Sequence, residues 1–97
     1  MLKAESYAEL NVLVDYLKAN KNYKAEVAGY TCNAGDETYN YQLSKRRAAS
    51  VVNYLKQKGI EQNRLISKGF GPENPAASNA TREGRKKNRR VEFKIQK

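Results

Sequence analysis

The sequence has few of the side chains that enzymes and metal sites commonly use. It contains no histidine and a single cysteine, Cys32, among its 97 residues. One cysteine excludes an internal disulfide, and the absence of histidine excludes a Ser-His-Asp triad and makes a zinc site improbable. No apolar run approaches the roughly 18 residues of a membrane helix, and the opening residues lack the apolar core of a signal peptide. We therefore expect a non-catalytic domain without a cofactor or a metal.

Positive charge is what the chain has in excess. Its 19 Lys and Arg face 10 Asp and Glu, which gives a formal charge of +9. With 39% hydrophobic and 30% charged residues the composition is globular, and the length fits one domain, residues 1–97. Such an excess attracts nucleic acid, anionic lipid or an acidic polymer, or it only keeps a domain soluble. Composition alone does not choose between these.

Hydrophobic spacing predicts helices that alternate with short strands. The first helix lies within residues 5–20, with Ser6 as N-cap and Glu9 completing a capping box. Gly59 is expected to end the second helix, and Thr81 to cap a short helical turn. The later elements are a strand at Lys24–Tyr30, a helix at Tyr39–Lys58, a strand at Leu65–Phe70, a helical turn at 81–87 and a strand at Val91–Ile95.

This order predicts an α/β fold with a mixed sheet. The two strands that flank the long helix should be parallel, because a right-handed crossover joins them, and the last strand should run antiparallel. Sites in open α/β sheets gather beyond the carboxyl ends of the strands. We therefore expect a site at the loop Thr31–Thr38 and the start of the second helix.

Two adjacent arginines of the second helix should point in different directions. On a helical wheel that starts at Leu43, Arg47 falls at about 40°, inside the apolar arc, whereas Arg46 falls at about 300°. A guanidinium that faces a core has to be paired or hydrogen-bonded. Arg47 could lie at the edge of the arc, pair with Asp36 or Glu37, or stand at the mouth of a cleft that accepts a carboxylate.

From Gly29 to Ile95 the sequence resembles the OmpA-like domain family, which includes peptidoglycan-associated lipoproteins and flagellar stator proteins. The family pattern reads G-H-T-D-x-x-G, N-x-x-L-S-x-x-R-A, G-x-G-x-x-x-P and N-R-R-V. The matching segments are Gly29–Gly35, Asn40–Ala48, Gly69–Pro75 and Asn88–Val91. The resemblance implies a two-layer sandwich in which two main helices pack on a mixed sheet.

The resemblance also implies non-covalent binding of the peptidoglycan stem peptide through the free end of its diaminopimelate. That end is a zwitterion, and the family arginine that binds its carboxylate corresponds to Arg47. Asn40 and Thr31 correspond to residues that would hydrogen-bond the ligand, and Leu43 would form an apolar wall. Alternatives remain for each: Asn40 could bond its own helix start, Thr31 its own turn, and Leu43 could belong to the core.

The chain departs from the family pattern at the expected anion. The family aspartate is Cys32 here, normally a neutral thiol, so Asp36 or Glu37 would have to supply the charge, or binding is weakened or altered. The family histidine is Tyr30. The basic run 85–90 is either a solvated turn or attracts the wall polymer, with Arg90 lining the site.

The resemblance has further implications for architecture and setting. The family opens with a strand that we expect to be missing from this chain, which would leave a sheet of three strands with a new exposed edge. The domain should lie in the periplasm, in a membrane-attached parent protein, and a dimer is left open. No nucleic-acid motif is present, so none is expected as a partner. The alternative is the same fold with lost wall binding, acting as a basic nucleic-acid or protein interaction module.

Overall fold

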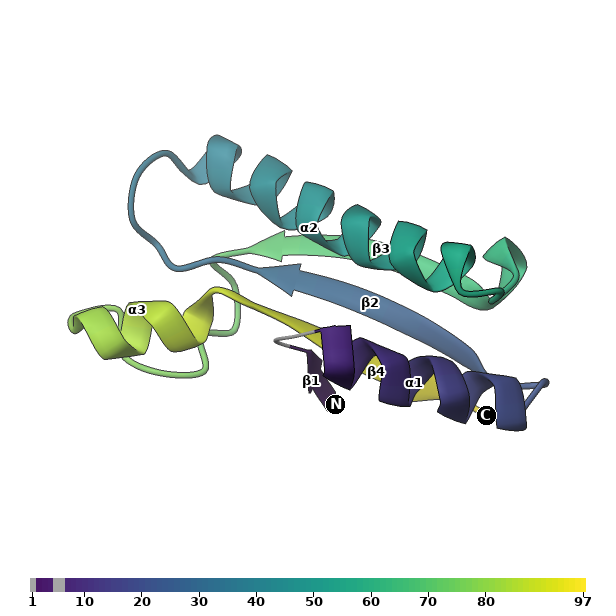
Figure 1. The fold of residues 1–97 in the computed structure, drawn as a ribbon. Helices are drawn as coiled ribbons and strands as arrows, with labels where there is room; N and C mark the ends of the chain where they lie inside the picture. The colour runs from purple at the N-terminus through teal and green to yellow at the C-terminus, as the bar shows by residue number, and fades with distance from the viewer. Residues whose placement is uncertain (1, 5–6) are drawn as a thin grey trace.

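The computed structural model describes residues 2–4 and 7–97, in which helices and strands alternate (Figure 1). The predicted N-cap Ser6 lies outside the described residues. None of the described helices is long and apolar enough to cross a membrane. In chain order the elements are β1 (Leu2–Ala4), α1 (Tyr7–Ala19), β2 (Lys24–Tyr30), α2 (Glu37–Gln57), the 3-10 turn η1 (Gln62–Arg64), β3 (Leu65–Gly71), α3 (Arg82–Asn88) and β4 (Arg90–Gln96).

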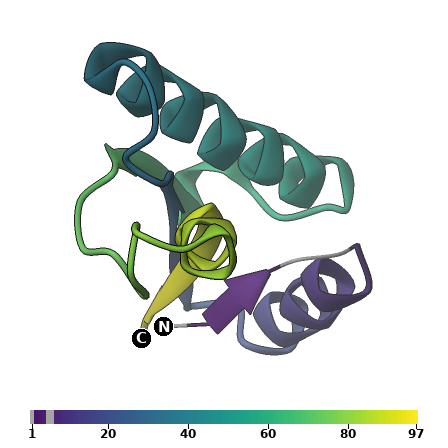
Figure 2. The ribbon, with the colours of Figure 1, turned by 90° about the vertical axis from the view of Figure 1, so that its left-hand side faces the viewer.

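The strands form one mixed sheet in the order β1-β4-β2-β3. β2 and β3 are parallel and β4 is antiparallel to β2, which confirms both predicted directions. Helices α1 and α2 cover the same face of this sheet (Figure 2). The predicted two-layer sandwich is therefore confirmed, and α2 forms the crossover between the parallel strands.

The expectation of a missing first strand was wrong. Leu2–Ala4 pairs with β4 antiparallel, with Leu2 opposite Phe93, so the described sheet has four strands. Only three residues make this strand, which is too few to show an alternating pattern, and helix-favouring residues follow it. Pairing nevertheless covers part of the edge of β4 that a three-stranded sheet would leave open.

The core lies between the helices and the sheet. The predicted stripe of α1 is buried at Leu10, Leu13, Val14 and Leu17, but Tyr7 at its start is 70% exposed. The residues that complete the buried cluster are Ala25, Val27, Ala48, Leu55, Ile60, Leu65, Val91 and Phe93. Since these come from β2, α2, β3 and β4, the cluster joins both layers.

The opposite face of the sheet carries ion pairs between charged side chains. Lys68 Nζ lies 3.0 Å from Glu26 Oε1, which joins β3 to β2. Arg90 Nε lies 2.7 Å from Glu92 Oε1 along β4. Alternation along the strands places these groups away from the helices, so the sheet presents a polar surface on this side.

Helix α2 approaches the parallel strands closely at two glycines. A Cβ added to Gly29 would overlap the backbone carbonyl of Ser44, and one added to Gly69 would overlap Lys45. Ser44 is fully buried, and its hydroxyl accepts a hydrogen bond from Gly71 N at 3.0 Å. The missing side chains therefore let the helix backbone rest directly on β2 and β3.

Gly29→Ala should destabilise the fold, because the new methyl group must push α2 away from the sheet. We expect the free energy of unfolding to fall by about 1–3 kcal/mol, as for overpacked cores. Urea denaturation followed by circular dichroism measures this. Ser67→Ala, at an exposed position of β3, is the control and should change stability by less than about 0.5 kcal/mol. Equal stability of the Gly29→Ala variant and the unchanged protein would contradict the close approach.

Candidate functional site

The candidate site lies at the end of the molecule where β2 and β3 finish. The loop after β2, the first turns of α2, and α3 surround this end (Figure 2). Helix α2 begins at Glu37, two residues before the predicted start, and α3 is capped by the Thr81 hydroxyl, which accepts a hydrogen bond from Gly84 N at 3.0 Å. Residues that are distant in the sequence therefore meet here.

Two side chains make hydrogen bonds where the loop meets α2. Asp36 is the N-cap, and its Oδ2 accepts a hydrogen bond from Tyr39 N at 2.9 Å. Asn40 is buried, and its Nδ2 donates to Ala34 O at 2.9 Å. Asn40 thus bonds the loop rather than its own helix start. Asn40 therefore shapes the loop, whereas Asp36 uses one carboxylate oxygen to cap the helix.

Thr31 leaves a polar group without a partner. It is only 3% exposed, and its backbone N donates to Gly71 O at 2.8 Å. Its hydroxyl makes no hydrogen bond to any described residue. A buried hydroxyl left unsatisfied costs about 1–3 kcal/mol. The turn uses the backbone of Thr31 and leaves its side chain free.

Cys32 is buried and lies beside a guanidinium. Arg89 Nη1 is 3.7 Å from the Cys32 sulfur, at the C-terminal end of α3. Burial raises the pKa of this thiol, but hydrogen bonds from the Ala34 backbone N–H and from Arg89, with the charge of Arg89, lower the pKa below its ordinary value overall. Donors suited to an anion therefore surround the position at which the family pattern has aspartate.

Arg90 lines the hollow, but its guanidinium is already bonded within the protein. Its Nε bonds Glu92, its Nη2 donates to Asn74 O at 2.8 Å, and the guanidinium lies 3.9 Å from the centre of the Tyr30 ring. The Tyr30 ring also stacks on Phe70 at 5.4 Å. Burial, and then the charge of Glu92, raises the pKa of the Tyr30 hydroxyl. Arg90 and Tyr30 thus form a structural pair.

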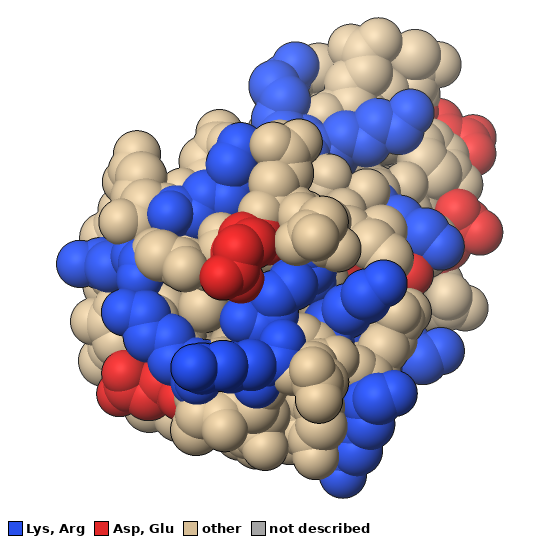
Figure 3. Space-filling model, turned by 90° about the vertical axis from the view of Figure 1, so that its right-hand side faces the viewer, with Lys and Arg blue, Asp and Glu red and all other residues tan. Residues whose placement is uncertain are grey.

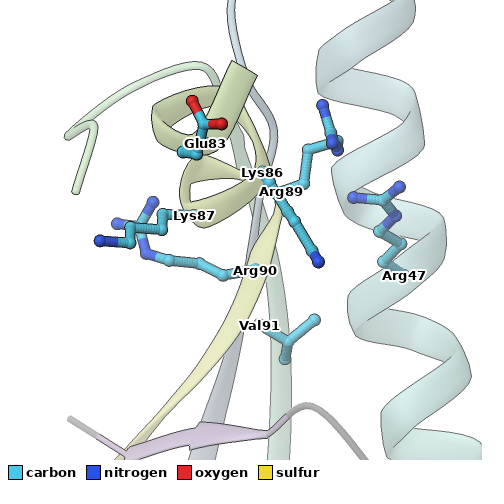
Figure 4. Close-up of a pocket in the computed structure, with 7 residues that line it drawn as sticks. All are labelled: Arg47, Glu83, Lys86, Lys87, Arg89, Arg90 and Val91. Carbon is cyan, nitrogen blue, oxygen red and sulfur yellow. The ribbon is translucent and has the colours of Figure 1, made fainter. Parts of the chain in front are cut away.

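Arg47 lies beside a hollow of about 790 Å³, with its side chain half-buried. In Figure 4 it extends from α2 toward α3, and Lys86 and Arg89 lie on the same side as Arg47. Within the described residues Arg47 forms no ion pair. Arg46 is exposed and lies 5.8 Å from the Tyr39 ring. Arg47 is therefore half-buried and Arg46 exposed, as the helical wheel predicts.

The charge around this hollow favours an anion. Five of its seven lining residues carry positive charge and only Glu83 is acidic; the full set is Arg47, Glu83, Lys86, Lys87, Arg89, Arg90 and Val91. Lys87 and Arg90 extend to the side away from Arg47 (Figure 4), so Arg47, Arg89 and Lys86 form the inner group. Asp36 and Glu37, the expected substitutes for the family aspartate, do not line it. The hollow is thus suited to a carboxylate.

Leu43, the expected apolar wall, is not among the residues that line the hollow. It is half-buried on α2, one turn before Arg47, and does not belong to the core cluster of the described residues. Among those residues, no group of three or more His, Cys, Asp or Glu side chains is placed to hold a metal ion. The polar groups that gather at this end are therefore arginines, lysines, amides and hydroxyls.

Arg89 is the residue that the sequence reasoning missed. The N-R-R-V match contains Arg89, but Arg90 is the residue that the sequence analysis expects to line the site. Alternation along β4 places the Arg90 side chain on the face opposite to the buried Val91, away from the helices. Arg89 is the C-cap of α3, which leaves its side chain able to reach Cys32. The two-residue alternation of a strand was the signal that could have shown which way the Arg90 side chain points.

Comparison with known proteins identifies the family of the chain. A model of the OmpA family matches residues 1–89. The chain belongs to the OmpA family. It is 46% identical over 94 residues to outer membrane protein A of Bordetella avium, a match that covers 97% of this chain and 48% of that protein. It is 45% identical over 89 residues to the peptidoglycan-binding protein ArfA of Mycobacterium tuberculosis, a match that covers 92% of this chain and 27% of that protein.

Solved structures show the same fold. The peptidoglycan-associated lipoprotein of Burkholderia pseudomallei superposes with a TM-score of 0.87 at 27% identity, over 92% of this chain and 75% of that one. The OmpA family match includes β1, in agreement with the four-stranded sheet. The chain spans between a quarter and a half of the two curated relatives. The names of these relatives describe envelope and peptidoglycan-binding proteins.

Arg89→Gln should raise the pKa of the Cys32 thiol. The substitution removes a positive charge and alters a hydrogen bond that favour the thiolate, while burial continues to favour the neutral thiol. The midpoint of thiolate formation, followed by ultraviolet absorbance against pH, should therefore move upward. Lys86→Gln, which removes the same charge from the same hollow, should shift the midpoint less. Equal midpoints in the Arg89→Gln variant and the unchanged protein would contradict the contact.

Proposed function

We propose that this OmpA family domain binds peptidoglycan non-covalently and anchors a parent protein to the cell wall, with no chemistry of its own. The observation that carries the proposal is Arg47, a half-buried guanidinium without an ion pair among the described residues, beside a hollow lined mainly by cations. Such a group is ready for an external carboxylate. The relatives named as peptidoglycan-binding and peptidoglycan-associated support the same ligand.

The ligand group is the free end of diaminopimelate, or of another diamino acid, on the stem peptide. Its carboxylate pairs with Arg47, and the unpartnered Thr31 hydroxyl and the amides of the following loop bind nearby. Asn40 keeps that loop in shape through Ala34, and Leu43, one turn before Arg47 on α2, is the proposed apolar wall.

The ammonium of the ligand meets a weaker anion than an aspartate. Cys32 occupies the position of the family aspartate, and its lowered pKa gives the thiol more anionic character than an isolated cysteine has. Arg89, however, already compensates that charge at 3.7 Å. We infer that the domain retains binding with less selectivity for the ammonium than its relatives with aspartate.

The proposed setting is the periplasm, on a parent protein attached to a membrane. A nucleic-acid function would use the +9 charge instead. Phosphate binding weakens steeply as salt rises, whereas a zwitterion in a pocket responds mildly. Pelleting with sacculi that persists between about 50 and 200 mM salt therefore favours the wall ligand.

Arg47→Ala should abolish or strongly reduce co-sedimentation with purified peptidoglycan sacculi. Loss of a charge-assisted contact worth about 1.5–3 kcal/mol lowers affinity about ten- to a hundredfold. Arg46→Ala is the matched control, since it removes the same charge from the neighbouring, exposed position and should pellet like the unchanged protein. If both variants pellet equally well, Arg47 is not part of the site.

Cys32→Asp should strengthen binding, because a carboxylate replaces a thiol opposite the ligand ammonium. Titration of free meso-diaminopimelate, followed by the NMR amide signals of residues 31–40, measures the affinity of each protein. Cys32→Ser is the control and should not gain affinity. No gain with aspartate would show that another group binds the ammonium or that the ligand is a different amino acid.

A further inference from the structure

The end of the molecule opposite the candidate site carries a second concentration of positive charge. Figure 3 views this end and shows Lys and Arg side chains spread across it, with fewer acidic groups between them. The exposed lysines that the chain places here come from α1, the loop after it, β2, the end of α2 and the residue after β4. They are Lys18, Lys21, Lys24, Lys56, Lys58 and Lys97, and we call them the basic end.

Contacts between the elements hold these lysines together in space. The end of the Lys18 side chain lies beside Gly59, just after α2. Lys97 Nζ lies 5.8 Å from the centre of the Tyr23 ring, and Lys24 is opposite Gln96 in the sheet. The basic end is therefore one surface, built from segments that are distant in the sequence.

Arg64 fixes the backbone beneath this surface. Its Nη2 donates to Leu17 O at 2.7 Å and to Asn20 O at 2.9 Å, and its Nε donates to Tyr23 O at 3.0 Å. These bonds tie the end of α1 and the following loop to η1. The loop that carries Lys21 is thus held rigidly in the folded domain.

The lysines are not neutralised within the protein. None of the six forms an ion pair with a described residue. Lys21 interacts electrostatically with Glu61, whose carboxylate is 3.3 Å from Arg64 Nη1. Because Arg64 already compensates Glu61, the basic end keeps its positive charge.

Helix capping explains only half of this charge. Lys18, Lys56 and Lys58 lie at the C-terminal ends of α1 and α2, where cations complement the helix dipoles. Lys21, Lys24 and Lys97 lie outside both helices and gain nothing from them. A separate reason is needed for cations on the loop, on β2 and after β4.

The arrangement fits an extended anionic surface better than a single anion. The lysines point from several elements instead of converging on one hollow, and lysine is a hydrated point charge without the bidentate geometry of arginine. Clusters of four to eight such cations are typical of binding to anionic phospholipid headgroups. The Tyr16 and Tyr23 rings lie 5.8 Å apart among them, and tyrosine favours the membrane–water interface.

We propose that the basic end binds the surface of a membrane that contains anionic phospholipid. The molecule is 41 Å long and about half as wide, with the candidate site at the other end. Salt at physiological strength screens charges beyond about 8–10 Å, so the two ends act independently. A domain bound to lipid through the basic end therefore presents its opposite end, with Arg47, away from the membrane.

Vesicle flotation tests this. The unchanged 97-residue chain should float with vesicles of phosphatidylglycerol and phosphatidylcholine, not with phosphatidylcholine alone, and should be released as salt rises. The triple variant Lys21→Gln, Lys56→Gln and Lys97→Gln should bind the anionic vesicles about a hundredfold more weakly. Failure of the unchanged chain to float with anionic vesicles at about 50 mM salt would overturn the proposal.

A matched triple variant distinguishes an effect of the basic end from an effect of the net charge. Lys45→Gln, Arg46→Gln and Arg82→Gln also lower the formal charge of +9 by three, at exposed positions away from this end. This variant should keep most of its vesicle binding, and an equal loss in both triple variants would overturn the proposal. So would tighter binding to a labelled DNA duplex than to anionic vesicles at the same salt.

Sacculus binding is the independent readout. The triple variant of the basic end should still pellet with sacculi, and Arg47→Ala should still float with anionic vesicles. Loss of vesicle binding in the Arg47→Ala variant would show that the lipid contacts the candidate site instead, which also overturns the proposal. The membrane proposal and the wall proposal can therefore fail separately.

Discussion

The close contact between α2 and the two parallel strands is the constraint on which the site depends. With no side chains at Gly29 and Gly69, the backbone of α2 rests on β2 and β3 at Ser44. A helix held this closely has little freedom to rotate about its axis, since the buried Ser44 bonds Gly71 directly. Arg47 follows Ser44 by three residues and is therefore turned toward α3 and the hollow. The direction of the guanidinium is thus a consequence of glycine packing one turn earlier in the helix.

A second consequence concerns the loop between β2 and α2. At the same end of α2, Asn40 holds the loop by the Ala34 carbonyl, and Asp36 caps the helix through Tyr39 N. Thr31 keeps a buried hydroxyl without a partner among the described residues, and Cys32 accepts a hydrogen bond from Arg89. Backbone bonds therefore shape the loop, while the Thr31 and Cys32 side chains are buried and do not line the hollow.

Sequence reasoning recovered the elements whose pattern is long and missed those that depend on a single contact. Seven alternating residues identified β2, and the wheel of α2 separated Arg47 from Arg46. β1 has only three residues, so its pairing with β4 has no periodic signal. The choice between Arg89 and Arg90 depends on where α3 ends and β4 begins, and boundaries are poorly determined by local pattern. The lowered pKa of the Cys32 thiol needs a neighbour 57 positions away, which no local pattern contains.

The positive charge of the chain is divided by the fold into two different surfaces. At one end Arg47, Arg89 and Lys86 converge on a hollow, where a planar guanidinium can select a carboxylate by geometry. At the other end lysines spread over a surface without a common focus, where only the summed charge acts. Composition treats both sets as one excess, so it could not distinguish a nucleic-acid, lipid or polymer partner. Only the placement of arginine in the hollow and of lysine on the open surface separates selective binding from general attraction to anions.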